Sequence, residues 1–310
     1  MEAPYQHSGI LLLAFGGPNS LDEVEPFLKN VYSGRPLNPF FVQQVRERYQ
    51  HIGGKSPLLS ITERQARSLQ NNLKKMGKPC EVNIGMRYWR PSIPEAIKAF
   101  QTKGIKKVLC LILSPFVIKA VSGGYYEAVD QTVKESRNSI EAHFVLPWNT
   151  NALYLDAVAA KLKEGFAFFS LNEGHGAPLI FTAHSLPVHW LGNDPYRDMI
   201  NQTISGVMER LASHDWYLAF QSRGSGKGKW LSPDVGEVLE ILATRGEKDV
   251  LVVPLGFVSD HLETLYDLDI VLRKKAHDLG INLQRAPSLN DSQKFIEALT
   301  EVVITSSNNW

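Results

Sequence analysis

Cysteine is scarce in this 310-residue sequence, which contains only Cys80 and Cys110 and no CxxC pair. Both lie in predicted strands, and we interpret them as buried free thiols of a reducing compartment, with a disulfide or a metal role as the alternative. Because an iron–sulfur cluster is typically held by four cysteine thiolates, two cysteines exclude a cluster of that kind held by this chain alone.

Long apolar runs are missing as well. A helix that spans a bilayer needs about 18 or more predominantly apolar residues in a row, and no such stretch occurs. The apolar run near the N-terminus, residues 10–15, is shorter than the core of a signal peptide and lacks its basic flank. We therefore expect a cytoplasmic protein without a transmembrane segment. A peripheral membrane contact and the choice between monomer and homodimer stay open.

Neither sign of charge is in excess, because Lys and Arg number 33 and Asp and Glu number 32. No basic stripe is interleaved with aromatic residues, so nucleic acid is not an expected partner. Phosphate-binding motifs are incomplete too. Gly16-Gly17-Pro18 lacks the spacing of a dinucleotide fingerprint, and Lys229 stands where a P-loop beginning at Gly224 would have its second glycine. We interpret residues 223–229 as a surface loop.

Short β-rich runs alternate with amphipathic segments along the whole chain. The predicted strands are residues 10–15, 81–86, 107–113, 142–146, 178–183, 216–220, 249–255 and 281–285. The predicted helices are residues 21–31, 39–51, 58–76, 93–103, 123–137, 151–168, 195–212, 234–245, 261–279 and 291–305. This alternation predicts βαβ units, and the nearly all-apolar strands indicate parallel sheets with helices on both faces.

The two halves of the chain have the same outline. Residues 111–117 resemble residues 252–258, and each run ends in a Phe-Val pair. The chain length also suggests two domains at about 150 residues each. We therefore predict an α/β fold with two similar domains, 1–148 and 149–310, and a cleft between them.

Polar elbows marked by glycine or proline follow six of the predicted strands. They begin at residues 16, 87, 114, 184, 221 and 256. The carboxyl ends of parallel strands share one edge of a sheet, where ligands bind. We expect the polar residues of these elbows to converge on one cleft, with His184 and Glu263 as the principal candidates.

His184 directly follows a predicted strand and is succeeded by Ser185 and, two residues later, Pro187. An imidazole there can accept a proton near neutral pH, because its ordinary pKa is about 6.5. The alternative is a histidine that is hydrogen-bonded to nearby backbone. Serine catalysis by Ser185 is disfavoured, since the G-x-S-x-G elbow of hydrolases is absent.

Asp260, Glu263 and Asp267 recur at i, i+3 and i+7, which predicts three carboxylates on one helix face. Like charges at this spacing repel, and a hard divalent cation or protons among them would remove the conflict. The alternative is a capping box formed by Asp260 and Glu263, which leaves Asp267 unexplained.

Aromatic residues and one arginine gather between residues 31 and 49, namely Tyr32, Phe40, Phe41, Arg48 and Tyr49. They suit a flat hydrophobic ligand, with Arg48 available for a carboxylate. The alternative is a helix that packs Phe40, Val42 and Val45 into the core.

Taken together, these motifs resemble those of ferrochelatase, the terminal metal-inserting enzyme of haem synthesis. The blocks that carry the resemblance run in order through nearly the whole chain: residues 13–18, 49–58, 84–88, 179–187 with 192–196, 230–233 and 259–267. The resemblance implies two Rossmann-like domains that clamp a tetrapyrrole, either protoporphyrin IX or coproporphyrin III, with ferrous iron as the second substrate and no tightly bound cofactor.

The resemblance also implies roles for individual residues. His184 and Glu263 would face each other across the macrocycle as metal ligands and proton acceptors. Asp260 and Asp267 would form a path for protons or metal. Porphyrin contacts would come from the matched blocks and nearby positions: Tyr32, Arg48, Tyr49, Ser56, Arg87 and Tyr125.

Two positions depart from the family pattern. Phe15 has no ligating atom where some bacterial relatives place a tyrosine, and Val271 interrupts an acidic row that some relatives extend. Two alternative functions remain. One is a cobalt or sirohydrochlorin chelatase of the same fold, against which the aromatic segment argues. The other is a non-catalytic tetrapyrrole carrier, which would not need the acidic row.

Overall fold

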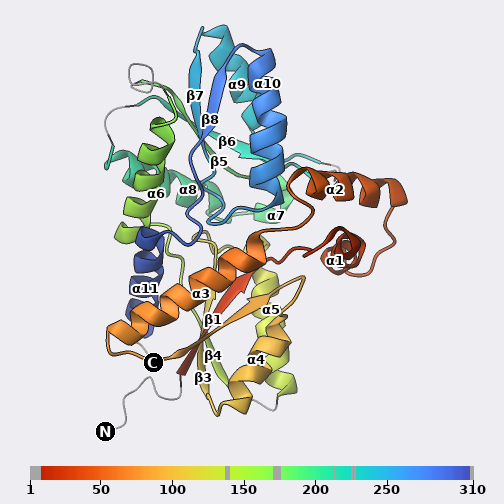
Figure 1. The fold of residues 1–310 in the computed structure, drawn as a ribbon, viewed down its shortest axis with the longest axis vertical. Helices are drawn as coiled ribbons and strands as arrows, with labels where there is room; N and C mark the ends of the chain where they lie inside the picture. The colour runs from red at the N-terminus through yellow and green to blue at the C-terminus, as the bar shows by residue number, and fades with distance from the viewer. Residues whose placement is uncertain are drawn as a thin grey trace. The chain divides into compact units, whose positions relative to one another are not determined.

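The computed structural model describes residues 8–136, 140–169, 176–211, 214–224, 226 and 228–307. The chain forms two compact units, each built on a four-stranded sheet flanked by helices (Figure 1). Unit 1 comprises Met1–Val117, Val121–Trp148 and Asn290–Trp310, and unit 2 comprises Ile118–Ala120 and Asn149–Leu289. The predicted fold class, α/β with parallel sheets between helices, is confirmed.

The sheet of unit 1 has the strand order β2-β1-β3-β4, with all neighbours parallel. Its strands are β1 (Ser8–Ala14), β2 (Glu81–Met86), β3 (Lys107–Ile112) and β4 (Glu141–Phe144). Its helical segments are η1 (Leu21–Glu23), α1 (Val24–Val31), α2 (Pro39–His51), α3 (Leu58–Lys75), α4 (Ile93–Thr102), α5 (Lys119–Glu135, of which the first two residues count with unit 2) and α11 (Gln293–Ser307).

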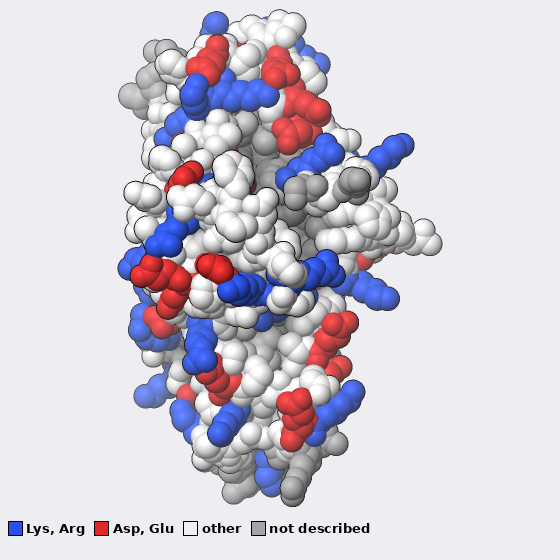
Figure 2. All heavy atoms as spheres, turned by 90° about the vertical axis from the view of Figure 1, so that its right-hand side faces the viewer, with Lys and Arg blue, Asp and Glu red and all other residues white. Residues whose placement is uncertain are grey.

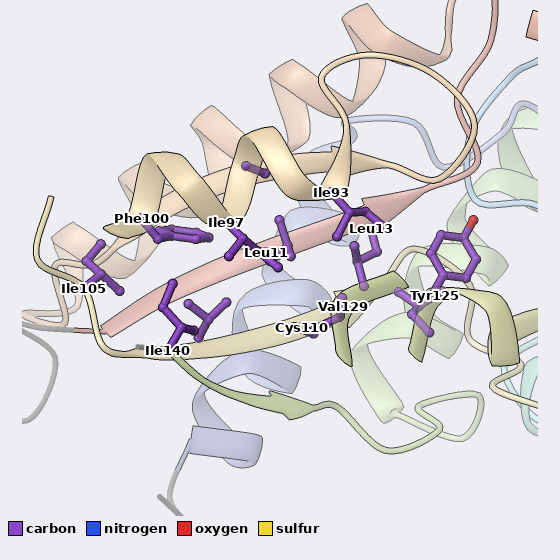
Figure 3. Close-up of a cluster of buried hydrophobic side chains, with 13 residues drawn as sticks. Leu11, Leu13, Ile93, Ile97, Phe100, Ile105, Cys110, Tyr125, Val129 and Ile140 are labelled. Carbon is purple, nitrogen blue, oxygen red and sulfur yellow. The ribbon is translucent and has the colours of Figure 1, made fainter. Parts of the chain in front are cut away.

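A core of unit 1 lies between its sheet and helices α4 and α5 (Figure 3). Leu11 and Leu13 of β1 and Ile97 and Phe100 of α4 are buried in it. Phe100 packs so closely over Gly9 that a Cβ at Gly9 would lie 2.5 Å from the phenyl ring. Glycine at this position therefore lets α4 approach the sheet.

The sheet of unit 2 repeats the pattern, with the order β6-β5-β7-β8 and parallel neighbours. Its strands are β5 (Leu179–His184), β6 (Trp216–Gln221), β7 (Asp249–Val253) and β8 (Asn282–Arg285). Its helices are α6 (Ala152–Phe166), α7 (Val188–Leu191), α8 (Tyr196–Met208), α9 (Val235–Thr244), the π-helix η2 (Glu263–Leu272) and α10 (Arg273–Asp278). In each sheet the first strand along the chain lies between the second and the third.

Every predicted strand occurs, with its ends within about two residues of the prediction. The helix predicted over 261–279 begins instead at Glu263 and is a π-helix over its first part. The short helix α7 was not predicted. Cys110 is buried in β3, whereas Cys80 precedes β2 and does not lie in a strand; both are free thiols.

The C-terminal helix α11 belongs to unit 1, where it packs against α3 and β3. Polar contacts fix its beginning: Arg64 lies 2.8 Å from the carboxylate of Asp291, and Gln65 donates a 2.7 Å hydrogen bond to the carbonyl of Asn290. The predicted second domain, 149–310, therefore extends past the end of unit 2 at Leu289. The amphipathic pattern of α11 indicates a buried face but does not say which sheet the face covers.

None of the described helices is long and apolar enough to cross a membrane. On the face drawn in Figure 2, basic and acidic side chains are interspersed.

Candidate active site

His184 is the last residue of β5, at the carboxyl edge of the sheet of unit 2. Its Nδ1 lies 2.6 Å from the carbonyl oxygen of Ser185. A carbonyl only accepts, so Nδ1 carries a proton and Nε2 is the atom left for a proton or a metal ion. The backbone contact that we considered as an alternative explanation exists, but it uses only one of the two ring nitrogens.

Glu263 is the first residue of the π-helix η2. Its Oε2 lies 3.5 Å from Nε2 of His184, is buried, and accepts no hydrogen bond from the residues that the structure describes. The backbone of Glu263 is held from β6, because Nε2 of Gln221 donates a 3.0 Å hydrogen bond to its carbonyl oxygen. This segment is a π-helix, a conformation often found at functional sites.

The pair does not face across a macrocycle, as the family resemblance implied. A flat ring between two groups needs about 7 Å, twice a van der Waals contact of about 3.5 Å. The 3.5 Å between Nε2 of His184 and Oε2 of Glu263 leaves no such space. Both side chains belong to unit 2 and act as neighbours, so a ligand would meet them together.

A second imidazole, which the sequence reasoning missed, completes this cluster. Nε2 of His261 lies 3.9 Å from Oε2 of Glu263, and its Nδ1 is 3.2 Å from the carbonyl oxygen of Ser259. The rings of His261 and His184 have their centroids 4.3 Å and 6.3 Å from that of Phe257. The available signal was a histidine two residues before Glu263 in the sequence.

Burial and charge act in opposite directions on the two paired groups. Burial lowers the pKa of His184, but the carboxylate of Glu263, the carbonyl of Ser185 and the charge of Asp267 outweigh burial and leave the pKa raised. Burial raises the pKa of Glu263, yet His184 and His261 together hold the pKa well below its usual range. The pairing of a protonated His184 with an ionised Glu263 is thus favoured in the free protein. His184 can accept a proton, as we predicted, only after its Nε2 proton has left.

The predicted row of three carboxylates is a row of two. Asp267, four residues after Glu263, accepts a 2.6 Å hydrogen bond from Ser222, whose φ is 56°. Asp260 lies before the helix, and Arg285 binds it. The alternative capping box is not formed either, since the N-cap residue of η2 is Leu262 and makes no side-chain cap.

Unit 1 brings two of the predicted porphyrin contacts together near the end of β1. A Cβ added at Gly17 would lie 2.6 Å from Ser56 and 3.8 Å from the hydroxyl of Tyr49. The amide of Ser56 donates a 2.8 Å hydrogen bond to the carbonyl of Pro18. Glycine at position 17 therefore allows Tyr49 and Ser56 to lie against the loop that leaves β1.

Arg87 and Tyr125 also lie together in unit 1. The Arg87 guanidinium is 5.3 Å from the Tyr125 ring centroid and 4.7 Å from that of Tyr88, and it donates a 3.3 Å hydrogen bond to the carbonyl of Val121. A Cβ at Gly124 would be 1.8 Å from this guanidinium, so only glycine permits its approach. Tyr125 is only 6% exposed, which limits the area that it offers to a ligand.

The aromatic segment of unit 1 is partly exposed. Tyr32 is 40% exposed at the end of α1 and forms an edge contact with Phe41. Phe40 is 68% exposed, Val42 is half-buried and Val45 is buried, so the alternative in which α2 packs all three into the core is wrong for Phe40. Arg48 lies in the last turn of α2.

The described residues contain no group of three or more His, Cys, Asp or Glu side chains arranged to hold a metal ion. An imidazole nitrogen and a carboxylate oxygen together can still bind divalent iron as an open, two-ligand site. His184 and Glu263 are thus a pair in unit 2 that could hold a metal ion. Asp267 lies four residues after Glu263 in η2.

Comparisons with known proteins agree with this chemistry. Residues 7–307 match the protein-family model described as Ferrochelatase. Curated relatives named Ferrochelatase include one from Geotalea daltonii, 39% identical over 316 residues, which cover 96% of this chain and 97% of the relative. Another from Geotalea uraniireducens is 40% identical over 316 residues, with the same coverage of 96% and 97%.

Among solved structures, SirB from Bacillus subtilis with Fe3+ superposes with a TM-score of 0.62 over 97% of this chain and 96% of that chain. The two sequences are 12% identical, so the likeness concerns the fold.

Proposed function

Because this chain belongs to the ferrochelatase family, we propose that it carries out metal insertion at the His184–Glu263 pair. The enzyme is a metal chelatase of the lyase class, and its reaction places ferrous iron in a porphyrin during haem biosynthesis, with release of two protons. The observation that carries the assignment of the site is the 3.5 Å contact between Nε2 of His184 and Oε2 of Glu263.

The two side chains suit an ion that must be delivered and not retained. An imidazole nitrogen and a carboxylate oxygen are both ligands for divalent iron, whereas a closed set of four ligands would hold the ion as a structural site does. Iron is therefore bound as a substrate, and the porphyrin nitrogens replace the protein ligands as it enters the ring.

The same pair removes protons from the porphyrin. The Nε2 proton of His184 first passes to the adjacent Glu263, and the neutral imidazole, whose pKa is raised, then accepts a pyrrole N–H proton. Glu263 lies next to it, and Asp267 follows four residues later on η2. We assign to Glu263 and Asp267 the passage of protons away from the ring.

The porphyrin contacts are proposed for unit 1. Tyr49 with Ser56, Arg87 with Tyr125, and Tyr32 with Arg48 supply aromatic faces, hydroxyls and cations, which match a flat macrocycle with carboxylate substituents. Walls of this kind can also bend the ring so that its nitrogen lone pairs face the metal, at a strain of about 1–5 kcal/mol met by binding elsewhere on the ring.

An anaerobic spectrophotometric assay tests this proposal. Purified protein is mixed with iron(II) and, in separate reactions, with protoporphyrin IX, coproporphyrin III or sirohydrochlorin. We expect metallation of one of the two porphyrins. Turnover of sirohydrochlorin alone would contradict the proposal and favour a sirohydrochlorin chelatase, whose present support is fold likeness to the Bacillus subtilis enzyme of that name at 11% identity.

A non-catalytic tetrapyrrole carrier is the second alternative, and Asp267→Asn separates it from the enzyme. A carrier needs a ligand for its cargo but no path for protons, so its porphyrin affinity would be unchanged and no insertion would be seen with either form. The enzyme, in contrast, should lose turnover in Asp267→Asn while it keeps porphyrin affinity.

Location and assembly are further parts of the proposal. We place the protein in the cytoplasm because both of its cysteines are free thiols. Cell fractionation tests the location and any peripheral membrane contact, and light scattering of the purified protein distinguishes monomer from homodimer.

A further inference from the structure

A buried arginine without an assigned role lies beside the helix that carries Glu263. Arg285 is the last residue of β8, and its side chain is 12% exposed. Its Nε and Nη2 donate to the two carboxylate oxygens of Asp269 at 2.7 and 2.8 Å. Its Nη1 donates to Oδ1 of Asp260 at 3.1 Å. One guanidinium therefore binds two carboxylates that belong to the same segment.

Asp260 is held by further hydrogen bonds. Ser288 donates a 2.7 Å hydrogen bond to Oδ1 of Asp260, and Thr264 approaches the same oxygen at 3.3 Å. Nη1 of Arg285 also donates to the hydroxyl of Ser288 at 3.2 Å. The end of β8 and the loop after it are thus linked to Asp260, which precedes η2, and to Asp269 within η2.

Glu263 lies between the two anchored carboxylates, three residues after Asp260 and six before Asp269. Its Oε2 is in long ion-pair contact with His184 and His261, at 3.5 and 3.9 Å, so the length of these contacts depends on where the backbone of η2 places Glu263. We infer that Arg285 is a positioning residue, which holds the segment 260–269 so that Oε2 of Glu263 stays beside Nε2 of His184. This inference rests on the proposed function of the His184–Glu263 pair.

The geometry requires arginine and not only a positive charge. The planar fork of a guanidinium can bind one carboxylate through two parallel hydrogen bonds and reach another carboxylate with its third nitrogen. A lysine ammonium keeps the charge but cannot reproduce the parallel pair. Arg285→Lys therefore tests positioning while it leaves a cation near Asp260 and Asp269.

The experiment measures zinc(II) insertion into the porphyrin that the wild-type enzyme accepts, with kcat and KM determined separately. Residues that orient a metal ligand typically change activity by about 10- to 100-fold when altered, so we expect Arg285→Lys to lower kcat in that range. The KM for porphyrin should change by no more than about twofold, since ring contacts are untouched.

Arg210→Lys is the matched control. Arg210 forms an ion pair with Asp156 and donates to the carbonyl of Gly206 in the same unit, away from η2. We expect it to change thermal stability without changing kcat. Equal kcat losses in both variants, or wild-type kcat in Arg285→Lys, would overturn the inference.

Ser288→Ala decides the matter if Arg285→Lys does not fold. It removes the hydrogen bond that Ser288 donates to Asp260 and the one that Ser288 accepts from Arg285, but no charge. We expect a several-fold lower kcat at unchanged KM. A folded Ser288→Ala enzyme with wild-type kcat would refute the positioning role.

Two further variants, Glu263→Gln and the double variant Glu263→Gln/Arg285→Lys, distinguish failure of the inference from failure of the proposed function. If Glu263→Gln keeps wild-type kcat, the pair itself is wrongly assigned and Arg285 has nothing to position. If Glu263→Gln loses activity and Arg285→Lys does not, the pair stands and the inference fails. If both lose activity, the double variant should be no slower than Glu263→Gln, because Arg285 acts through Glu263.

Discussion

The two units of this protein share one strand order but differ in what their equivalent strands present. β1 and β5 hold the same place in their sheets. β1 is followed by Phe15, an apolar ring that is 45% exposed, whereas β5 ends in His184, which pairs with Glu263. The carboxyl edge of unit 1 is therefore aromatic at this position, and that of unit 2 is ionisable.

The surroundings of each residue extend the contrast. Phe15 packs against Tyr88 and Phe27, with ring centroids 4.7 Å and 6.3 Å away. His184 has a carboxylate at 3.5 Å, and a second imidazole reaches the same carboxylate. A shared topology thus sets where a site can be, and the side chains that follow the strands set its chemistry. The comparison supports our proposal that unit 1 binds the ring and that unit 2 handles the metal and the protons.

Replacing the ionisable residue of β5 should have the largest effect. We expect His184→Ala to lower kcat by roughly 10²- to 10⁴-fold, the range for loss of a proton acceptor, since it also removes a metal ligand. Metal insertion is measured spectrophotometrically, and circular dichroism should show an intact fold. An active, well-folded His184→Ala enzyme would show that unit 2 does not supply the chemistry.

The Glu263→Gln substitution should have the next largest effect. The amide keeps the shape of the side chain but removes the charge that raises the pKa of His184 and that we propose binds iron, so we expect kcat to fall by about 10²-fold. Porphyrin affinity, measured by fluorescence quenching, should stay near that of the wild type. A parallel loss of porphyrin affinity would mean that Glu263 contacts the ring and would blur the division between the units.

Substitution of Phe15, at the aromatic edge of unit 1, should weaken porphyrin binding and leave the chemical step unchanged. Phe15→Ala removes an exposed ring that is available for a macrocycle, and one aromatic contact contributes about 1 kcal/mol, or about a fivefold change in affinity. We expect a KM for porphyrin higher by that factor with kcat nearly unchanged. A change confined to kcat would place Phe15 in the chemistry of the reaction.

The smallest effect concerns stability against pH. Because the pKa of His184 is raised, its charged form stabilises the native state fully below the unfolded pKa of about 6.5, and this is lost as pH rises through the folded pKa. The lowered pKa of Glu263 stabilises the protein above about pH 4.3 and is lost as pH falls further.

Urea unfolding of wild type and Glu263→Gln at several pH values tests this. The difference in unfolding free energy should be largest between about pH 4.5 and 6.5 and shrink toward pH 9. A difference that is constant over this range would show that the two groups are not electrostatically coupled.

Local pattern was sufficient for much of the fold and for the centre of the site. Apolar runs that end in glycine- or proline-marked elbows identified the strands, and the residues at two elbows, His184 and Glu263, do lie together. These signals are local, since a strand and its exit loop are written in consecutive residues. The roles of His184 and Glu263 remain to be tested by the substitutions above.

Spacing along one helix was a less reliable guide. The i, i+3, i+7 pattern grouped Asp260 with Glu263 and Asp267, but the helix begins only at Glu263 and is a π-helix. Asp260 instead faces Arg285, which is 25 residues further along the chain. No pattern of consecutive residues predicts this ion pair, because β8 and the segment before η2 come together only when the sheet forms.

The amino-acid order alone specified alternating strands and helices, two similar halves and the positions of the ionisable residues, because each of these depends on neighbours within one element. Folding determined that Nε2 of His184 lies beside Glu263, that His261 reaches the same carboxylate, that Arg285 binds two carboxylates of one segment, and that α11 joins unit 1. Each of these depends on distances between segments far apart in the chain, which packing sets and local propensity does not.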